Sequence, residues 1–535
     1  MKTMRTRSTQ NAHRGRRSLS VAGLVTERRD TTPLRTAFLE GASGRRVTWG
    51  EIAVAAADWT VQRRRLGVAP LARVGVVMGD PLAAATAHIA ALAAGVTVAP
   101  LNPQAPADEL AAEVRGLGLS TVVTDGGAEA GLDDLAASGA QVWLTGPGGL
   151  RLARFRPWPA TTVSPGPAAL IMASSGTTGP RKIIPLTEGQ LLGTAAAVAD
   201  HHHITPDDRG YSPLPLFHIN GLVVGVLSTL VAGSTLVVDG KFSRRHFWTT
   251  VADHDVTWLN LVPAIIGLLA ETAPPGAVTE RIRFARSASA PLAPGTLGRF
   301  EGRTGISVLE TYGMTEAASQ IAANPLDARA RRPGSVGRGV GVEIRVVDET
   351  GQPVGADTVG AVEIRGDHVV DQYWSATEHG LAARPARRPG GWLTSGDLGR
   401  FDEDGFLYLV GRSDDVINRG GEKLYPAEIE AVLLGDTRVT AAVVVGRRHP
   451  IAGEEPVAFV LADVPPSGRA RLTEELHARC SRSLSAFKRP ADISVAETLP
   501  CGPTGKVRRA DVRRQAAQLY RIGQSSPLHP QPVRA

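Results

Sequence analysis

The feature that most constrains this chain is a hydroxyl- and glycine-rich segment ending in two cations: Ser174, Ser175, Gly176, Thr177, Thr178, Gly179, Pro180, Arg181 and Lys182. The apolar runs on either side, residues 168–173 and 182–186, are typical of buried strands. The segment is therefore predicted to be a loop between two strands. A helix follows only after Pro185, with Thr187 as its N-cap and Gln190 completing a capping box.

The residue types of this loop suit a polyphosphate. Its order differs from a Walker-type P-loop, which runs strand, loop, helix and requires Gly-Lys-Ser/Thr. Two glycines nevertheless let the backbone approach a ligand closely, four hydroxyls can donate to phosphate oxygens, and Arg181 and Lys182 can balance the charge. A solvated Ser/Gly turn would have the same composition. The segment alone does not decide between the two.

The composition is that of a soluble globular protein with a large core. The chain has 535 residues, 43% hydrophobic and 21% charged, and a rule of roughly one domain per 150 residues allows about three or four folding units. Its apolar stretches are interrupted well short of a membrane span, so none is predicted. Only Cys480 and Cys501 are present, too few for a disulfide framework or a zinc site. So few cysteines fit a reducing compartment, and we predict a cytoplasmic location.

The net charge of +7 is concentrated at the N-terminus. Residues 1–20 hold six cations and no acid, which leaves the rest of the chain at +1. We therefore do not expect a nucleic-acid partner. The basic segment lacks the apolar core of a secretory signal, and we predict that residues 1–30 form a disordered basic leader.

The order of elements predicts an α/β fold. From residue 35 to 149 helices alternate with buried strands, among them the expected strands 73–78 and 96–100 around a helix over 81–94. This pattern indicates a layered, parallel α/β sheet. A long apolar helix is expected over 222–230, and further strand-to-loop units over 256–263, 283–291 and 308–316.

Two smaller parts follow. From residue 334 onward short β runs, such as 342–347 and 360–365, predict a small β subdomain. We expect a large N-terminal domain over 31–412, a small α+β domain over 413–520 and a disordered tail over 521–535. The strands of the small domain are predicted at 441–445, 456–461 and 492–495, with a helix over 473–484.

Three positions carry candidate chemistry. His218 lies between an apolar strand and Gly221, and a lone histidine there is more often a core or turn residue than a catalytic one. His201, His202 and His203 invite a metal interpretation, but consecutive residues do not face one site, so a solvated helix end is preferred. The strand end at 308–316 brings an aromatic ring, a hydroxyl and a carboxylate into one loop, where open α/β sheets bind ligands.

Seven motifs in fixed order identify a family. They are the loop 174–182, Phe-His-Ile-Asn-Gly at 217–221, Tyr-Gly-Met-Thr-Glu at 312–316, Thr-Ser-Gly-Asp at 394–397, Gly-Arg-Ser-Asp-Asp at 411–415, Gly-Gly-Glu-Lys at 420–423 and Pro-Thr-Gly-Lys at 503–506. In this order the chain resembles the adenylate-forming superfamily of acyl- and aryl-CoA synthetases, luciferases and peptide-synthetase adenylation domains. The resemblance covers about residues 30–520. It implies a small C-terminal domain that is mobile.

The resemblance implies roles at the nucleotide. Tyr312 would stack on adenine, Thr315 would contact the α-phosphate and Glu316 would hold Mg²⁺, all of which the side chains permit. Asp397 would accept hydrogen bonds from the ribose hydroxyls, with Arg412 assisting. The other cofactor-binding residues implied are Ser174, Ser175, Gly176, Thr177, Thr178, Gly179, Lys182, Ser289, Ala290, Pro291, Glu310, Thr311, Gly313, Met314, Gly421 and Lys423.

The resemblance also implies a two-step reaction with ATP, Mg²⁺ and coenzyme A. A carboxylic acid would attack the α-phosphate of ATP, releasing pyrophosphate, and the thiol of coenzyme A would displace AMP. Lys506 would stabilise the charge of the first step, with Thr315, Glu316 and His218 as the other catalytic residues. Asp414 would be the hinge for a domain rotation between the steps.

The residues of several further segments most resemble those of oxalate-CoA ligases and their bacterial relatives, which implies a small or polar acid. The segments that carry this are 283–292, 324–326, 333–337 and 417–423. Three departures stand against the standard pattern: Arg181 replaces a usual Pro, Ile183 a usual Gly and Glu188 a frequent His. They put the standard substrate in doubt, and two alternatives to the CoA ligase remain. One is an enzyme of secondary metabolism that activates nitrite to diazotise an aryl amine. The other is a non-catalytic nucleotide-binding protein, which would have no need of Lys506.

Overall fold

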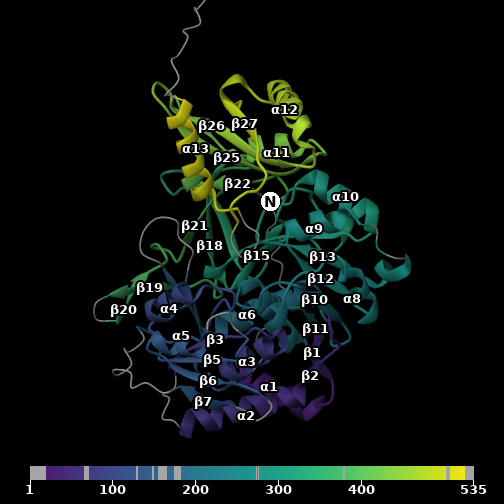
Figure 1. Cartoon of the computed structure of the whole chain (residues 1–535), viewed down its shortest axis with the longest axis vertical. Coiled ribbons are helices and arrows are strands. Elements are labelled where there is room, and N and C mark those ends of the chain that lie inside the picture. Colours follow the sequence, from purple (N-terminus) through teal and green to yellow (C-terminus); the bar gives the residue numbers. More distant parts are fainter. Residues whose placement is uncertain are drawn as a thin grey trace, which may run out of the picture. The chain divides into compact units, whose positions relative to one another are not determined.

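The computed structural model describes residues 20–65, 71–127, 131–146, 150–154, 165–173, 182–272, 274, 276–377, 380–501 and 507–523 (Figure 1). Their contacts divide the chain into two compact units. The first contains Met1–Phe242, Thr315–Ser319 and Asp367–Ala386, and the second contains Ser243–Met314, Gln320–Gly366 and Arg387–Ala535. The predicted domain boundary at residues 412 and 413 lies inside the second unit and stays a prediction.

The first unit is built on a nine-stranded sheet. At its centre β3 (Arg73–Val77), buried along its whole length, pairs in parallel with β4 (Thr97–Pro100) and β5 (Thr121–Thr124). Parallel strands of this kind are buried on both faces and read as continuous apolar runs. The remaining strands and helices of this layer are β6 (Gln141–Leu144), β7 (Arg151–Arg154), β8 (Leu170–Ala173), β9 (Ile183–Leu186), β19 (Gln372–Thr377), β20 (Gly380–Pro385), α3 (Pro81–Ala93), α4 (Ala107–Gly116) and α5 (Leu132–Ala137).

A second group of strands in the first unit has the order β2, β1, β11 and β10. These strands span Arg46–Thr48, Thr36–Glu40, Thr235–Val238 and Arg209–Ser212, accompanied by α2 (Trp49–Arg65) and α6 (Glu188–His201). The apolar helix predicted over 222–230 is a π-helix, η1 (Asn220–Leu227), followed by α7 (Ser228–Ala232). Apolar periodicity does not distinguish these two backbone windings, because every residue of η1 is buried.

The disordered leader predicted over 1–30 is wrong for its last part, because Val21–Thr31 is the helix α1. Ser20 caps it by accepting from the Gly23 amide, and Val21, Leu24 and Val25 are buried. A second acceptor for the orphan amides of the first turn comes from far away in sequence: Glu188 Oε1 accepts from the Val21 amide at 2.6 Å. Residues 1–19 lie outside the described residues.

The turn from β9 into α6 confirms the predicted capping box. The Gln190 amide donates to Thr187 Oγ1 at 3.2 Å, and the Thr187 amide donates to Gln190 Oε1 at 2.9 Å. The other end of the Gln190 side chain donates from Nε2 to the carbonyl oxygen of Val369 at 2.8 Å. Gln190 is buried, so one side chain satisfies both the helix terminus and a distant segment.

The second unit begins with a parallel set, β12 (Trp258–Leu261), β13 (Phe284–Ser287) and β14 (Val308–Met314). The predicted small β subdomain is confirmed as the antiparallel sheet β17 (Glu343–Val347), β18 (Gly360–Arg365), β21 (Leu393–Phe401) and β22 (Leu407–Arg412). The hairpin β19–β20, which is interleaved with it in sequence, instead extends the large sheet of the first unit. The unit also contains α8 (Phe247–Asp253), α9 (Pro263–Ala270), α10 (Pro294–Thr304), β16 (Arg338–Gly339) and, from Gln320 on, β15 (Ser319–Ala323).

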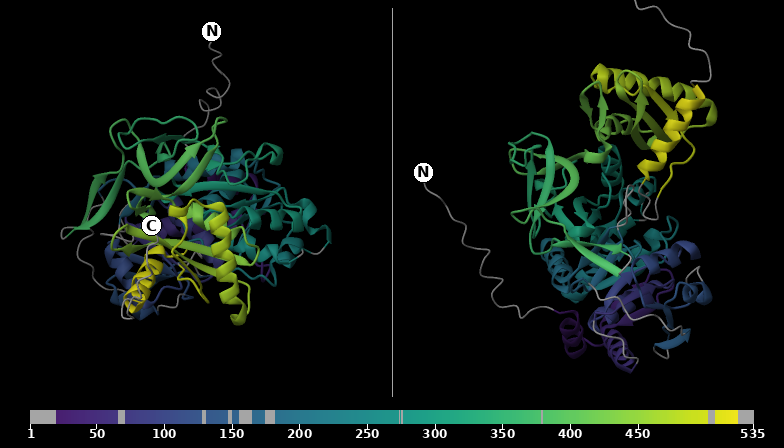
Figure 2. Two further views of the ribbon diagram at one scale, coloured as in Figure 1. Left: turned by 90° about the horizontal axis from the view of Figure 1, so that it is seen from above. Right: turned by 90° about the vertical axis from the view of Figure 1, so that its left-hand side faces the viewer.

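The C-terminal part of the second unit is α+β, as predicted (Figure 2). Along β25 (Val439–His449), Val444 packs into one hydrophobic core with α11 (Pro426–Leu434) and α12 (Arg469–Ser483), whereas Val443 and Val445 pack into another with α13 (Arg509–Gly523). Helices therefore cover both faces, which the alternation of strand side chains requires. The sheet is completed by β23 (Ile417–Arg419), β24 (Glu422–Leu424), β26 (Gly453–Ala462) and β27 (Asp492–Val495).

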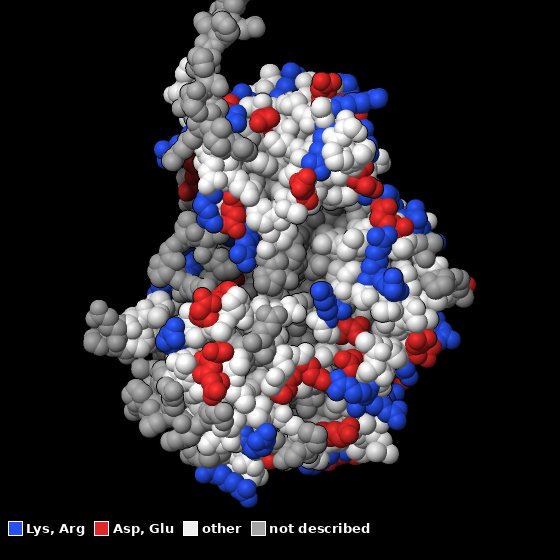
Figure 3. Space-filling model, in the orientation of Figure 1, with Lys and Arg blue, Asp and Glu red and all other residues white. Residues whose placement is uncertain are grey.

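The tail predicted over 521–535 is wrong for its first three residues, because α13 continues to Gly523. No helix among the described ranges is long and apolar enough to cross a membrane. On the face seen in Figure 3, cationic and anionic side chains are interspersed.

The two hydrogen bonds of the Gln190 side chain, from the Thr187 amide and to the Val369 carbonyl, lead to a stability prediction. Gln190→Ala removes both the acceptor for the Thr187 amide and the buried hydrogen bond from Nε2 to the Val369 carbonyl, so we expect a loss of about 2–4 kcal/mol. Glu51→Ala is the matched control, because Glu51 forms a capping box with Thr48 at an exposed helix start. It should cost about 0.5–1 kcal/mol. Urea unfolding followed by circular dichroism measures both, and equal losses would contradict the role of Val369.

Candidate functional site

Part of the predicted site lies outside the described residues, namely Ser174–Arg181 of the loop and the catalytic candidate Lys506. The strands that flank the loop are present: β8 and β9 pair antiparallel, with Ala173 opposite Ile183. Lys182 directly precedes β9 and is exposed. The predicted strand–loop–strand arrangement is therefore confirmed at both of its ends.

In the first unit, Lys182 and Glu316 both contact Tyr373. Glu316 lies in the short helix η3 (Thr315–Ala317) and is half-buried. Tyr373 Oη donates to Glu316 Oε1 at 3.4 Å, and Lys182 Nζ lies 5.1 Å from the centre of the Tyr373 ring. Burial, followed by the nearby Glu316 carboxylate, raises the pKa of Tyr373 above its ordinary value. The phenol therefore remains a hydrogen-bond donor at any physiological pH.

His218, also in the first unit, is held as a neutral imidazole. Burial lowers its pKa to about 4. Its Nε2 is buried with no hydrogen-bond partner among the described residues, and its ring lies 4.5 Å from that of Phe217. A neutral ring with an unused nitrogen can meet a ligand but cannot act as a proton donor of ordinary imidazolium acidity near pH 7. Its predicted catalytic role stays a prediction.

In the second unit, three predicted nucleoside-binding residues meet. Asp397 on β21 lies directly opposite Arg412 on β22. Arg412 Nη1 is 3.2 Å from Asp397 Oδ1, and Tyr312 Oη donates to Asp397 Oδ2. Tyr312 and Asp397 are 85 residues apart in sequence and both are buried. The arrangement joins an aromatic ring to a carboxylate with a cation beside it, which suits a base and its ribose.

The carboxyl ends of β13 and β14 bring together further predicted cofactor-binding residues. Thr311 Oγ1 donates to the Ser287 carbonyl at 2.9 Å, and the Gly334 amide donates to Glu310 Oε1 at 3.0 Å. Burial is the main cause that raises the pKa of Glu310 to about 7. Just past β13, Ser289 has a φ of 75°, a left-handed conformation that is uncommon for a residue other than glycine. The exposed Ala290 and Pro291 follow it.

The candidates near the start of the C-terminal part are exposed. Asp414 lies in η5 (Ser413–Asp415), and Lys423 lies in β24. The turn between β23 and β24 needs left-handed backbone at Gly420 and Gly421, with φ of 63° and 93°. The Gly421 amide donates to Asn418 Oδ1 at 3.0 Å.

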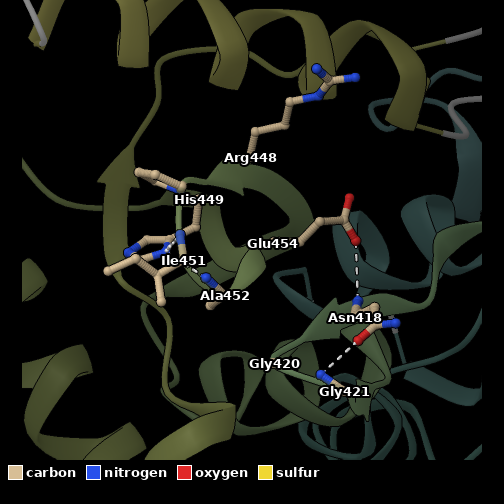
Figure 4. A pocket seen from close by; sticks show the side chains of 10 residues that line it. Asn418, Gly420, Gly421, Arg448, His449, Ile451, Ala452 and Glu454 are labelled. Carbon is tan, nitrogen blue, oxygen red and sulfur yellow. Dashed lines mark hydrogen bonds between the residues drawn. The ribbon is translucent and has the colours of Figure 1, made fainter.

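This turn borders an open cavity of about 730 Å³ (Figure 4). Glu454 Oε2 accepts from the Asn418 amide on one side, while the Arg448 side chain points away from Asn418. The polar groups around the cavity therefore do not converge on one point. The lining residues are Asn418, Gly420, Gly421, Arg448, His449, Pro450, Ile451, Ala452, Gly453 and Glu454.

Two of the three departures from the family pattern have structural roles. Ile183 is buried and packs with Trp374 in the hydrophobic core of the large sheet, and the two residues pair across β9 and β19. Glu188 accepts from the Val21 amide at the start of α1. Arg181 lies outside the described residues.

Neither Tyr373 nor the contact of Gln190 with Val369 was predicted from the sequence. A signal for Tyr373 was present, because Gln372–Thr377 carries the adjacent aromatic residues Tyr373 and Trp374, which must face opposite sides of a strand. No local signal could have shown that Trp374 of this strand pairs with Ile183 of β9, since the pairing of strands so far apart in sequence depends on the fold.

The described residues contain no group of three or more His, Cys, Asp and Glu side chains that could hold a metal ion. A magnesium ion bound together with phosphates needs only one or two protein carboxylates. The half-buried Glu316 carboxylate, oriented by Tyr373, fits that requirement.

Comparison with known proteins gives consistent matches. The family model for the AMP-binding enzyme matches residues 25–374, and that for the AMP-binding enzyme C-terminal domain matches residues 428–506. A sulfoacetate–CoA ligase of Cupriavidus necator is 36% identical over 92% of this chain and 96% of its own length. An oxalate–CoA ligase of Arabidopsis thaliana is 38% identical over 64% of this chain and 67% of its own length.

Among solved structures, ATP-bound MatB from Rhodopseudomonas palustris superimposes with a TM-score of 0.82 at 28% identity. The match covers 93% of this chain and 99% of that chain. The predicted α/β fold class is confirmed by this likeness together with the sheets described above.

The buried Glu310 carboxyl predicts a pH dependence of stability. Its pKa rises from 4.5 to about 7 on folding, so the folded protein binds more protons between these values and stability falls as the pH rises through 7. Glu310→Gln keeps an acceptor for the Gly334 amide but removes the ionisation. Above pH 7 the variant should be more stable than the wild type by about 1–3 kcal/mol, with a smaller difference near pH 5.

Urea unfolding at a series of pH values measures this difference. The exposed Glu403→Gln, which removes the same charge elsewhere, serves as the control and should follow the wild-type curve. A constant offset between the Glu310→Gln and wild-type curves would show that Glu310 does not change its pKa on folding.

Proposed function

The chain belongs to the AMP-binding enzyme family, and from this premise we propose that it is an ATP-dependent ligase which adenylates a small or polar carboxylic acid and transfers the acyl group to coenzyme A. The observation that carries the proposal is the meeting of the buried Tyr312 and Asp397 with the exposed Arg412. A ring, a carboxylate and a cation brought together from distant segments have the chemistry that a nucleoside needs.

Each residue of this group has a defined task in the proposal. Tyr312 offers its ring to adenine, and its hydroxyl orients the Asp397 carboxylate. Asp397 accepts hydrogen bonds from the ribose hydroxyls, while the guanidinium group of Arg412, 3.2 Å from Asp397 Oδ1, places a positive charge beside the carboxylate. Thr311, Gly313 and Met314, with Ser289, Ala290 and Pro291, would complete the walls around the nucleotide.

The phosphate chain would be bound by residues of the first unit. Lys182 and the preceding loop residues would contact the β- and γ-phosphates, and Thr315 the α-phosphate. Glu316 would hold Mg²⁺, which neutralises phosphate charge when bound. The half-buried position of Glu316 and its hydrogen bond from Tyr373 fix the direction of the carboxylate.

The first half-reaction makes the acid into an acyl donor. One oxygen of the carboxylate forms a bond to the α-phosphorus, the bond to the bridging oxygen breaks, and pyrophosphate leaves with the electron pair. Negative charge gathers on the reacting oxygens, where Lys506 would stabilise it. His218, which burial keeps neutral, would contact the acid without donating a proton to it and quenching the nucleophile.

The second half-reaction uses AMP as the leaving group. The sulfur of coenzyme A bonds to the acyl carbon, the acyl–phosphate bond breaks, and the thiol proton is released to solvent. We propose that Asp414 is the hinge that exchanges Lys506 for the turn containing Gly421 and Lys423 between the steps. Both Asp414 and this turn are exposed, as mobile elements should be.

The class of acid follows from the relatives. The sulfoacetate–CoA ligase and the oxalate–CoA ligase named above each act, by their names, on a small acid with a second anionic group. We propose the same class for this chain, and cytoplasm as its location. Nitrite activation loses support from the structure, because Ile183 and Glu188 are explained by packing and by the contact with α1.

A panel of acids tests the proposal. We expect ATP and magnesium ions to yield pyrophosphate only with one or a few small polar acids, such as oxalate, malonate or sulfoacetate, and not with long-chain fatty acids. Nitrite with an aryl amine is included in the panel. Release of inorganic phosphate in place of pyrophosphate would contradict adenylation, and pyrophosphate release with nitrite alone would favour the diazotising alternative.

The division of the reaction between two states predicts a split effect of Lys506→Ala. The variant should lose about two to four kcal/mol of transition-state stabilisation in adenylation, which is roughly 30- to 1,000-fold in rate. Thioester formation from a presynthesised acyl-adenylate should be nearly unchanged. The exposed Lys241→Ala is the control. Equal loss in both half-reactions would exclude the proposed division, and no loss would exclude Lys506 as the catalytic lysine.

A further inference from the structure

Tyr373 contacts two cations, Arg384 on the neighbouring strand β20 and Lys182 directly before the other neighbouring strand, β9. It lies directly opposite Arg384 in the β19–β20 hairpin, and the guanidinium carbon of Arg384 is 5.0 Å from the ring centre. On its other side β19 pairs with β9, where Trp374 lies opposite Ile183. The Lys182 ammonium group is 5.1 Å from the same Tyr373 ring.

Strand alternation explains why these three side chains share a face. Ile183 and Trp374 both point into the hydrophobic core of the large sheet. Their neighbours Lys182 and Tyr373 therefore point to the opposite face, where Lys182 is the diagonal neighbour of Tyr373. Arg384 faces Tyr373 across the hairpin and belongs to the same row.

A tyrosine ring attracts both cations without cancelling their charge. A carboxylate at this position would form ion pairs with Lys182 and Arg384 and would compete with any anionic ligand. The ring instead holds the cations through its quadrupole, so their full positive charge remains for a phosphate. Such an arrangement suits a polyphosphate site, where several cations must be held close together without being neutralised by a protein carboxylate.

The hydroxyl of Tyr373 connects the row to Glu316. It donates to Glu316 Oε1 at 3.4 Å, and the Val370 amide donates to the Glu316 backbone carbonyl at 2.8 Å. The segment that carries Tyr373 is thus attached to Glu316 through both main chain and side chain. Because Tyr373 is itself buried, its ring has little freedom to move.

We propose that Tyr373 is a positioning residue that couples the metal-binding carboxylate of Glu316 to the phosphate-binding ammonium of Lys182. The inference rests on the proposed function, in which these two groups bind the magnesium ion and the phosphates of ATP. The hydroxyl fixes the carboxylate and the ring fixes the ammonium, so one rigid side chain sets the separation between the two ligand-binding groups.

Two substitutions separate the two contacts. Tyr373→Phe keeps the ring under Lys182 and Arg384 but removes the donor to Glu316. We expect the magnesium concentration that half-saturates ATP binding to rise about fivefold, as for the loss of one hydrogen bond of ordinary strength, while the affinity for ATP in EDTA is unchanged. Tyr373→Leu removes both contacts, so the affinity for ATP in EDTA should also fall several-fold.

Calorimetric titration of the full-length protein with ATP, in EDTA and at a series of magnesium concentrations, measures these effects without turnover. Tyr408 on β22 provides the matched control, because its ring lies 4.7 Å from the guanidinium carbon of Arg400 on β21. Tyr408→Phe and Tyr408→Leu should leave both affinities at wild-type values. Circular dichroism confirms folding, and Tyr373→Phe remains decisive if Tyr373→Leu does not fold.

The outcomes distinguish this inference from the function on which it rests. If the wild type does not bind ATP, the proposed function fails and the positioning role fails with it. If the wild type binds ATP with magnesium dependence but Tyr373→Phe matches it, the positioning role alone is wrong. A uniform loss of affinity in Tyr373→Phe, with and without magnesium, would also overturn it, since that result indicates a general structural effect.

Discussion

The phosphate side of the site depends on the side-chain amide of Gln190. Its oxygen caps the Thr187 amide, which fixes the angle at which β9 enters α6, and its nitrogen binds the carbonyl of Val369. The next residue, Val370, binds the Glu316 backbone. Because Lys182 immediately precedes β9 and Tyr373 follows Val370 by three residues, one buried amide determines where the cation, the ring and the carboxylate can meet.

The candidate residues form two groups, and each group lies within one compact unit. Lys182, Tyr373 and Glu316 belong to the first unit, and Tyr312, Asp397 and Arg412 belong to the second. The chain passes from one unit to the other between Met314 and Thr315, inside the motif 312–316. The hydrogen bonds of each group therefore lie within a single unit. The motif 312–316 contributes to both groups, because it supplies Tyr312 to the proposed nucleoside contacts and Glu316 to the proposed phosphate contacts.

Local signals predicted much of this arrangement. The capping box at Thr187, the strands beside the phosphate loop and the small β subdomain follow from short-range residue patterns, which act over three or four positions. The same patterns could not show that the amide of Gln190 has a second partner 179 residues away. Residue patterns also led to the wrong prediction that the end of the leader is disordered. The apolar pattern of α1 is weak, and the helix is stabilised by the distant Glu188 and by burial of Val21 and Leu24.

The departures from the family pattern at Ile183 and Glu188 are explained by structural contacts and do not require an unusual substrate. Glycine at position 183 would leave a cavity beside Trp374, so isoleucine there is explained by the density of the core. Glu188 follows the N-cap of α6 and also accepts from α1, so its negative charge serves two helix N-termini at once. Neither side chain needs an unusual substrate to explain it. The identity of the acid must then be determined by residues that line its own binding pocket, whereas Lys182, Glu316 and Tyr373 serve a phosphate chain that every substrate of this class shares.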